Sequence, residues 1–449
     1  MASIKRRYYA WLIKAYFKKM RRTIISSVVL GILVFFAFIG LLNYYFRPLI
    51  FKTTESIGYA GTYTIPTLPK ELLSEISFGL TTVNSKGQIQ LAAAQSYTIN
   101  DEKEYTFKLK RGLKFHDGKE FTSQNVNLNF ADVTAKAIDK YTISYVLKNP
   151  YSPFLASVAG PIFGKNLTGI GKMKIDDVDV NGGFVRTMTL SNMTVKDKKK
   201  KIYFYPTQKA LKVAFMLGEV SEIYGVNSTK INTTDLSKWK KVKTESYTNY
   251  TSLVSLFYNS NDSILSNKKI RQALNYSLPE DLPFGERAFG PIPPNSIYFS
   301  QPPTYKISDI ELAKTLLSTV KDPIKDPIVI STTEEYEEVA QEVSAAWKKL
   351  GILSKTKIVQ GIPSDFQVFI YEIRLPEDPD QYVLWHSDQV NNITHYKNLR
   401  IDKLLEDGRS ISDVEKRKKI YADFQKYLTD DVPASFFYFP REYNLTKTK

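Results

Sequence analysis

Side chains suited to acid–base or metal chemistry are scarce in this sequence. Its three histidines, at positions 116, 386 and 395, are far apart, and none forms the HxH or HxxxH pair typical of metal ligands. His116 stands directly beside Asp117, a pairing that would suit a catalytic relay or half of a metal site. The absence of cysteine from the sequence excludes disulfides, thiolate zinc sites, cysteine nucleophiles and lipid attachment through an N-terminal cysteine.

The residues around His116 favour a turn over an active site. Apolar and polar residues alternate over 105–110, which is the period of a half-buried strand. Asp117 is followed by Gly118, and Asp-Gly tolerates the positive backbone angles of a tight hairpin. A helix beginning near Gln124 should follow. Because the sequence offers neither a nucleophile nor a third ligand here, we predict a structural histidine, no catalytic residue and no metal.

Length and charge limit the classes of partner. A chain of 449 residues exceeds the size at which one hydrophobic core usually keeps growing, so we expect at least two lobes. The net charge is +16, but residues 1–22 contribute eight basic and no acidic side chains, which leaves 54 basic and 46 acidic residues elsewhere. We therefore predict no nucleic-acid partner, and we interpret the basic run 196–201 as the solvated tip of a hairpin.

Residues 23–46 form a stretch of 24 uncharged, mostly apolar residues behind this basic leader. At ~1.5 Å per residue, a helix of this length covers a ~30 Å hydrocarbon core, which predicts a single-pass membrane anchor. The basic leader would stay in the cytoplasm, so the chain beyond the anchor would be extracytoplasmic. The alternative is a cleaved signal peptide, whose apolar region is typically ~7–15 residues and ends at a small-x-small site that this stretch lacks.

Strand-like and helical patterns alternate after residue 54, which predicts an α/β architecture. Three later helices are marked by capping boxes, in which Ser or Thr is followed three residues later by Glu, and each carries an apolar stripe. These boxes begin at Ser308, Thr332 and Ser412. Strand candidates lie between and after these helices, at residues 357–360, 366–371 and 434–439.

Eight motifs, in sequence order, resemble those of one protein family. The first is YTFKLKRGLKFHDGKEFTSQNV at residues 105–126, which contains the His-Asp-Gly turn. The others are LKNPYSPFLA (147–156), VAFMLGEVSEIYGV (213–226), NKKIRQALNYSL (267–278), GPIPP (290–294), AKTLLSTV (313–320), DPDQYVLWHS (378–387) and the stretch 395–439. Together they are similar to the family 5 extracellular solute-binding proteins of ABC transporters, the oligopeptide-, dipeptide- and nickel-binding group. The resemblance extends over about residues 62–439.

The resemblance implies an α/β fold of the periplasmic-binding-protein type, a two-lobed clamshell that closes around its ligand and performs no chemistry. Lobe one would comprise residues 54–246 and 435–449, and lobe two residues 247–434. The implied protein is a receptor anchored in the cell membrane through residues 23–46, which presents a peptide or another small solute to an ABC transporter permease. The resemblance implies no cofactor and no enzymatic activity.

The sequence departs from the family at the ligand site. In peptide-binding members, an Asp four residues before the Pro of a DPD element holds the ligand's amino terminus; here that position is Leu375. Glu372, Glu377 and Asp378 are the nearby acids that could take over this role. Since binding groups collect at strand ends in α/β lobes, the segment Tyr371–Tyr382 is our site prediction. The candidate ligand-binding residues, whose aromatic members suit a core equally well, are Tyr371, Glu372, Arg374, Asp378, Tyr382, Trp385, Asn391, Asn392 and Tyr396.

Two other functions are weighed against this one. A tethered sensor or structural partner would keep the fold but have a degenerate cleft that no longer serves import, and the identity of any co-purified ligand would separate it from a receptor. An extracytoplasmic hydrolase would require a catalytic constellation, which the sequence does not offer.

Overall fold

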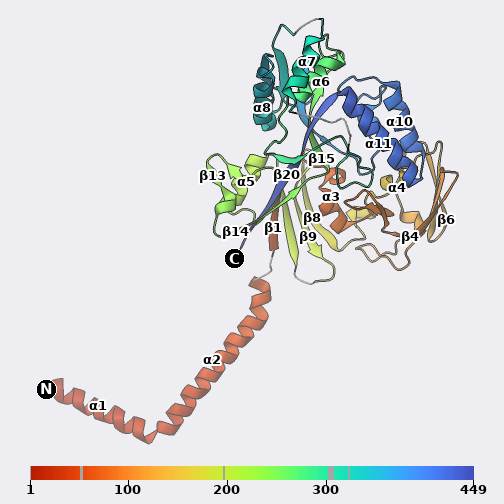
Figure 1. Ribbon diagram of the computed structural model, residues 1–449. Helices are drawn as coiled ribbons and strands as arrows, with labels where there is room; N and C mark the ends of the chain where they lie inside the picture. The colour runs from red at the N-terminus through yellow and green to blue at the C-terminus, as the bar shows by residue number, and fades with distance from the viewer. Residues whose placement is uncertain (1, 51–53, 196–197, 302–307, 322–323, 449) are drawn as a thin grey trace.

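The computed structural model describes residues 2–50, 54–195, 198–301, 308–321 and 324–448. Two N-terminal helices, α1 (Ala2–Lys19) and α2 (Arg21–Ile50), extend away from the rest of the chain (Figure 1). The rest is a layered assembly of strands and helices, which begins with strand β1 (Thr54–Ala60).

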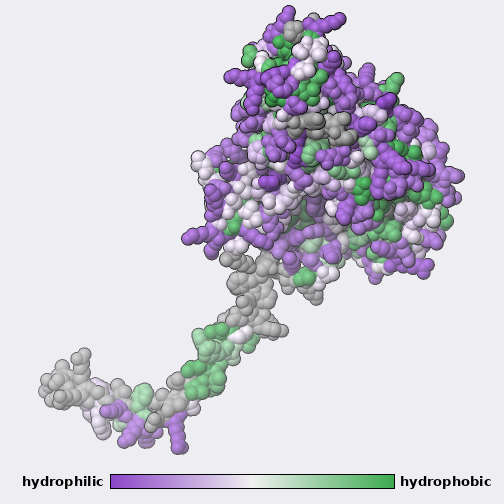
Figure 2. All heavy atoms as spheres, viewed as in Figure 1, coloured by the Kyte–Doolittle hydropathy of each residue, from purple (hydrophilic) through white to green (hydrophobic). Residues whose placement is uncertain are grey.

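Helix α2 contains the whole predicted membrane segment, residues 23–46, and Figure 2 shows hydrophobic side chains along it. Within the described part of the chain, however, no helix is long and apolar enough to cross a membrane. The structure therefore does not support the predicted transmembrane anchor.

One twelve-stranded sheet runs through both lobes in the order β18-β17-β19-β15-β20-β11-β1-β10-β9-β8, with β14 and β16 also pairing with β20. Its strands in lobe two are β15 (Ser252–Tyr258), β16 (Gly285–Arg287), β17 (Ile328–Thr332), β18 (Ser354–Ile358) and β19 (Val368–Arg374). Its further strands in lobe one are β8 (Met173–Asn181), β9 (Phe184–Asn192), β10 (Lys199–Tyr205), β11 (Glu222–Val226) and β14 (Val242–Thr248). Parallel and antiparallel pairs both occur in it.

Strand β20 (Ala434–Lys447) belongs to both lobes. Residues 434–440 pair with β15 and β16 of lobe two, whereas residues 441–447 pair with β14 and β11 of lobe one. The second crossing is the short connection from β14 to β15, where the N–H of Asn249 donates to the carbonyl of Pro440 at 2.8 Å. Two neighbouring strand segments thus join the lobes. The predicted start of the lobe-one tail, residue 435, lies within the part of β20 that pairs with lobe-two strands.

Helices cover both faces of the sheet in lobe two (Figure 1). Val254 and Leu256 of β15 belong to one buried cluster, and Leu253 and Phe257 to another, because successive strand residues point to opposite faces. All seven residues of β15 are consequently buried. The first cluster includes side chains of α6 (Lys268–Tyr276), α7 (Ile310–Ser318) and α8 (Glu337–Lys348), and the second those of α10 (Leu399–Ser410) and α11 (Val414–Asp431).

Lobe one also contains a separate four-stranded sheet, in the order β4-β5-β7-β6. Tyr105, Phe107 and Leu109 of β5 are buried in its core, as the sequence alternation predicts. This sheet lies beside α10 and α11 (Figure 1), and the N–H of Ser152 donates to the carbonyl of Arg409 at 2.7 Å. Its strands are β4 (Ala94–Asn100), β5 (Glu104–Leu109), β6 (Val133–Asp139) and β7 (Thr142–Leu147).

Shorter elements complete the fold. The helices are α3 (Lys70–Ile76), α4 (Phe154–Ser157), α5 (Gln208–Leu217) and α9 (Tyr382–Trp385). Two strand pairs are β2 (Thr81–Val83) with β3 (Ile89–Leu91), and β12 (Lys230–Ile231) with β13 (Thr234–Asp235). Single 3₁₀ turns are η1 (Ile65–Thr67), η2 (Ser123–Asn125), η3 (Lys165–Leu167), η4 (Leu236–Lys238) and η5 (Glu334–Tyr336).

Several boundaries differ from the predictions. Asp309 and Asp413, not the serines directly before them, accept the hydrogen bonds that cap α7 and α11. The helix predicted near Gln124 is the single turn η2. Lys199, Lys200 and Lys201 of the basic run lie in strand β10, which pairs with β9 as a hairpin would; residues 196–197 fall outside the described part of the chain.

Candidate functional site

The predicted segment Tyr371–Tyr382 starts in strand β19 and continues as a loop to α9. Pairing of β19 with β15 places Arg374 opposite Ser252, the first residue of β15 after the lobe crossing. The N–H of Leu375 then donates to the carbonyl of Thr251, at 2.8 Å. The segment therefore leaves the sheet at the end of lobe two that adjoins the crossing to lobe one.

Contacts between the lobes surround this position. Lys70 at the start of α3, in lobe one, forms an ion pair with Glu377 of the segment. On lobe two, Glu335 Oε1 accepts a hydrogen bond from Asn227 Nδ2 of lobe one at 2.5 Å. These pairs join residues 307 and 108 positions apart in the chain, so no local sequence pattern signals them.

Burial affects two ionisable residues at this boundary. Lys70 and Glu335 are both exposed to solvent, yet the surrounding protein removes part of their hydration. This burial lowers the pKa of Lys70. It raises the pKa of Glu335, and the negative charge of Glu372 raises that pKa further. The hydrogen bond from Asn227 and the positive charge of Lys212 oppose the rise at Glu335. Lys70 and Glu335 are therefore exposed yet partly desolvated.

Three of the predicted ligand residues lie at this edge. Tyr371 is half-buried against the core of lobe two. Glu372 Oε2 accepts a hydrogen bond from Tyr336 Oη at 2.7 Å. Arg374 is exposed, and its positive charge opposes the rise that burial gives to the pKa of Tyr63 in lobe one. All three side chains are at least partly exposed to solvent.

The acids further along the segment are held by arginines of lobe two. Asp378 forms two hydrogen bonds with Arg417, of 2.6 and 3.0 Å, and both side chains are nearly buried. Asp380 is also buried and pairs with Arg409 at 2.9 Å. Burial raises the pKa of Asp380, although the charge of Arg409 opposes the shift. The geometry of Asp378 and Asp380 is that of structural ion pairs.

The predicted aromatic residues of α9 pack inside lobe two. Tyr382 stacks on His386 with ring centroids 4.1 Å apart, and the guanidinium of Arg409 lies 4.0 Å from the Tyr382 ring centroid. Trp385 is 1% exposed, and its Nε1 donates to Gln381 Oε1 at 2.9 Å. Trp385 is therefore part of the core, the alternative that its residue type left open.

The remaining candidates stabilise the loop that follows α9. Asn392 is buried; its Nδ2 donates to the carbonyl of Tyr396 at 2.8 Å, and its Oδ1 accepts from Thr394 Oγ1 at 2.7 Å. Tyr396 is buried and its hydroxyl bonds to Asp431. Asn391 is exposed on the same loop. The structure thus groups Tyr371, Glu372 and Arg374 at the lobe boundary and separates them from this loop.

His116 has the structural role that the sequence predicts. Its Nδ1 accepts from the N–H of Gly169 at 3.1 Å, and its Nε2 lies 3.0 Å from the carbonyl oxygen of Gly171. Burial lowers the pKa of His116, which favours the neutral ring that can accept at one nitrogen and donate at the other. Gly118 has φ +84°, as the Asp117-Gly118 turn requires. His116 therefore ties the hairpin to a neighbouring loop.

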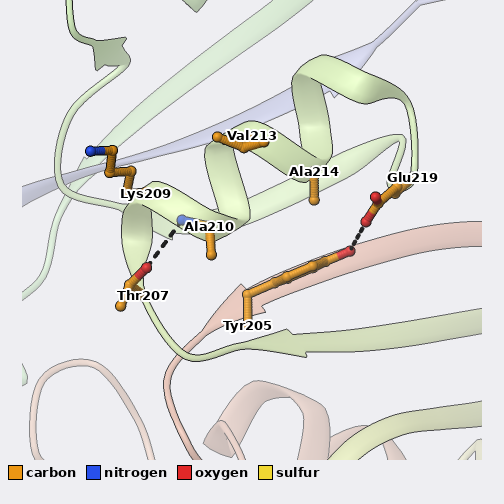
Figure 3. A pocket seen from close by; sticks show the side chains of 7 residues that line it. All are labelled: Tyr205, Thr207, Lys209, Ala210, Val213, Ala214 and Glu219. Atoms are coloured by element: carbon orange, nitrogen blue, oxygen red, sulfur yellow. Dashed lines mark hydrogen bonds between the residues drawn. The ribbon is translucent and has the colours of Figure 1, made fainter.

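A cavity of about 430 Å³ lies elsewhere on lobe one, between the end of β10 and helix α5 (Figure 3). Tyr205 Oη donates to Glu219 Oε2 across it at 3.2 Å, and Thr207 caps α5 by accepting from the N–H of Ala210 at 3.1 Å. It shares no residue with the predicted segment. Across the described residues, no group of three or more His, Cys, Asp or Glu side chains is placed to hold a metal ion.

Comparison with known proteins places these features in a family. Residues 88–174 and 194–392 match the sequence model described as "Bacterial extracellular solute-binding proteins, family 5 Middle". The oligopeptide-binding protein AppA of Bacillus subtilis is 25% identical over 445 residues, covering 81% of this chain and 80% of AppA. The probable D,D-dipeptide-binding periplasmic protein DdpA of Escherichia coli is 23% identical over 419 residues, covering 78% of each chain.

Solved structures show the same fold. The ABC transporter substrate-binding protein CtaP of Listeria monocytogenes superposes with a TM-score of 0.74 at 22% identity, covering 88% of this chain and 94% of CtaP. AppA of Bacillus subtilis in complex with a nonapeptide gives 0.67 at 22% identity, covering 88% and 94%. NikZ of Campylobacter jejuni in complex with Ni(L-His) gives 0.72 at 19% identity, covering 89% and 94%. The predicted two-lobed α/β fold is thus confirmed.

Proposed function

This chain belongs to the bacterial extracellular solute-binding proteins of family 5, and from this premise we propose that it binds a peptide or another small solute between its lobes and presents it to an ABC transporter permease. The observation that carries the proposal is the position of β19, which ends beside the lobe crossing with Arg374 exposed at its last position. Closure of two lobes about such a crossing is an established way to bury a ligand.

A peptide is the proposed solute class. The relative AppA is named an oligopeptide-binding protein, and its solved structure holds a nonapeptide. NikZ, which holds Ni(L-His), shows that this fold also takes other small solutes. Leu375 is buried in the lobe-two core, so it supplies no carboxylate for a peptide's amino terminus.

The proposed ligand contacts are a subset of the predicted residues. Tyr371, Glu372 and Arg374 are assigned to the cleft, with Tyr63 on the opposing lobe, because these side chains lie at the lobe boundary. Five other predicted residues are assigned a supporting role through their contacts within lobe two, whereas Asn391 is exposed on the loop that follows α9. They are Asp378, Tyr382, Trp385, Asn392 and Tyr396.

Membrane tethering through residues 23–46 is also part of the proposal, with the basic leader in the cytoplasm and both lobes outside. Its support is the uncharged sequence and the exposure of apolar side chains in α2, such as Leu33 and Phe36, which are 61% and 65% exposed. Membrane fractionation with alkaline extraction tests it. Release of the full chain into the soluble extract would refute the tether and leave the binding function untouched.

The binding function is tested by purifying the full chain from the cells that produce it and identifying small molecules released on denaturation by mass spectrometry. The expected result is a stoichiometric peptide or small solute. Protein that emerges empty, and that also fails to retain any member of a random tetrapeptide mixture in equilibrium dialysis, would favour the tethered sensor or structural partner instead.

A further inference from the structure

The lobe-one part of the main sheet has two hairpin turns at opposite ends. β10 is parallel to β1 and antiparallel to β9, so the turn between β9 and β10 lies at the end where β1 starts. The turn between β8 and β9 lies at the other end, about 27 Å away along β9. We call the first turn, residues 192–195, the base tip, and the second turn the far tip.

The base tip lies at the end of lobe one that α2 joins (Figure 1). Helix α2 ends at Ile50 and β1 begins at Thr54, and the chain between these two positions spans at most about 14 Å. Thr54 is paired with Lys199, the first residue of β10. The base tip is consequently held close to any membrane that contains α2.

The base tip presents apolar side chains on a fixed turn. Asn192 Oδ1 accepts hydrogen bonds from the N–H of Thr194 at 2.8 Å and from the N–H of Val195 at 2.9 Å. The N–H of Met193 donates to the carbonyl of Lys172 at 2.9 Å. Met193 and Val195 are nevertheless 50% and 53% exposed. Two neighbouring aliphatic side chains that the fold leaves in water are suited to contact with an apolar partner.

The charges beside the base tip suit a layer of lipid headgroups. The acids at this end of the sheet are each paired with a lysine: Glu55 with Lys198, Asp176 with Lys199 and Glu75 with Lys200. Lys172 is exposed, and the ion pairs among the described residues do not include it. Exposed acids on β8 begin at Asp177, four positions beyond Met173 and thus about 13 Å further from the tip. A lysine beside apolar side chains can place its ammonium at lipid phosphates while its stem covers hydrocarbon.

We propose that the base tip docks on the surface of the bilayer that contains α2, with Met193 and Val195 among the lipid chains and Lys172 at the phosphates. The partner is a lipid surface. This inference rests on the proposed tether through residues 23–46 and adds a second contact with the same membrane. It goes beyond the proposed binding function, because it fixes which end of lobe one faces the bilayer.

The test exploits the absence of cysteine, which allows a single fluorescent label at a chosen position. Val195→Cys, Phe184→Cys and Leu33→Cys are each labelled with the dye NBD in the full chain. Each protein is reconstituted in liposomes of phosphatidylcholine and phosphatidylglycerol, with and without lipids whose acyl chains carry a quenching spin label. Phe184 is the matched control, because it is 47% exposed but lies at the far tip.

We expect the spin-labelled lipids to quench the label at position 195 at least about twofold, since interfacial apolar groups lie ~5–10 Å into the headgroup and acyl boundary. The label at position 184 should not be quenched, and the label at position 33 should be. Quenching at position 33 without quenching at 195, or equal quenching at 195 and 184, would overturn the docking contact and leave the tether intact. No quenching at position 33 would overturn the tether, and the inference with it.

A second substitution shows whether the tip itself makes the contact, or whether the dye drives it. Met193→Gln, added to the labelled Val195→Cys protein, should remove most of the quenching, because a polar amide opposes entry among lipid chains. Val180→Gln at the far tip is its matched control and should leave the quenching unchanged, since Val180 is 46% exposed. Both substitutions are at exposed positions, so urea denaturation should show unchanged stability. Full quenching in the Met193→Gln protein would overturn the proposed contact.

Discussion

The two halves of the segment Tyr371–Tyr382 contain similar residues in opposite environments. In the first half, Glu372 and Arg374 lie at the end of a strand with groups that solvent can reach. In the second half, Asp378 and Asp380 are enclosed by arginines from α10 and α11. The difference shows that residue type did not decide which acids stay accessible to solvent. Partners supplied by distant helices decided it.

The buried ion pairs stabilise the fold only when both charges are present and their hydrogen bonds are made. Transferring an isolated charge into a protein interior is costly, and a paired charge is tolerated when its hydrogen bonds are satisfied. Arg417 satisfies this condition by bonding both oxygens of Asp378 while Tyr298 and Tyr421 rings lie 5.1 and 5.3 Å from its guanidinium. Breaking such a pair should damage the fold more than altering the exposed half of the segment.

The largest effect is expected for Asp378→Asn. It leaves the buried Arg417 without its anionic partner, so the free energy of unfolding should fall by about 3–5 kcal/mol, as measured by urea denaturation of the full chain. Asp407→Asn is the control, because its pair with Lys403 is largely exposed and should contribute at most ~1 kcal/mol. Equal losses for the two variants would remove the distinction between buried and exposed acids.

Asp380→Asn should cost less, about 1–2 kcal/mol. Burial already raises the pKa of Asp380, which means that the fold disfavours its ionised form. Arg409 also keeps its stacking on Tyr382 and remains partly exposed to water. Urea denaturation at neutral pH compares the two aspartates directly, and a loss for Asp380→Asn that exceeds the loss for Asp378→Asn contradicts this ordering.

Glu372→Gln should change the free energy of unfolding by less than ~1 kcal/mol, since the side chain is only half-buried and an amide can still accept from Tyr336. This variant should also retain peptides with a free amino terminus as well as the unchanged protein does, because Glu372 is already engaged by the Tyr336 hydroxyl. A tenfold loss confined to peptides with a free amino terminus would instead identify Glu372 as the partner of an ammonium group.

The smallest effect is a pH dependence at Glu335. Its folded pKa is raised above the usual 4.5, so between 4.5 and the folded value the native state binds more protons than the unfolded state. The free energy of unfolding should therefore fall as pH rises through this window. Glu335→Gln should flatten that slope in urea denaturation at several pH values. Glu337→Gln, on the exposed first turn of α8, should leave the slope unchanged.

Much of the fold was predictable because it depends on local signals. The alternation in β5 and the Asp117-Gly118 turn were read correctly, and helices do follow each of the three capping boxes. The caps themselves were assigned one residue early at α7 and α11, since Asp and the preceding Ser are both good acceptors and spacing alone does not choose between them.

The placement of the ligand site in the segment 371–382 stays a prediction. A strand end in an α/β lobe indicated residues 371–382, but Trp385, Asn392 and Tyr396 were included although they lie in the core. An aromatic or amide side chain suits a core and a cleft equally well, so its burial cannot be inferred from its neighbours in sequence.

The sequence by itself determined backbone conformation and the alternation of faces, because these depend on residues a few positions apart. Only the tertiary structure decided which charges are free. Arg417 reaches Asp378 from 39 residues away, and Lys70 reaches Glu377 from 307. An ion pair forms wherever packing brings two opposite charges within a few ångströms of each other. Neither the composition nor the hydrophobic period of the sequence tells which distant residues packing brings together. The exposure of Arg374 is for this reason a property of the fold.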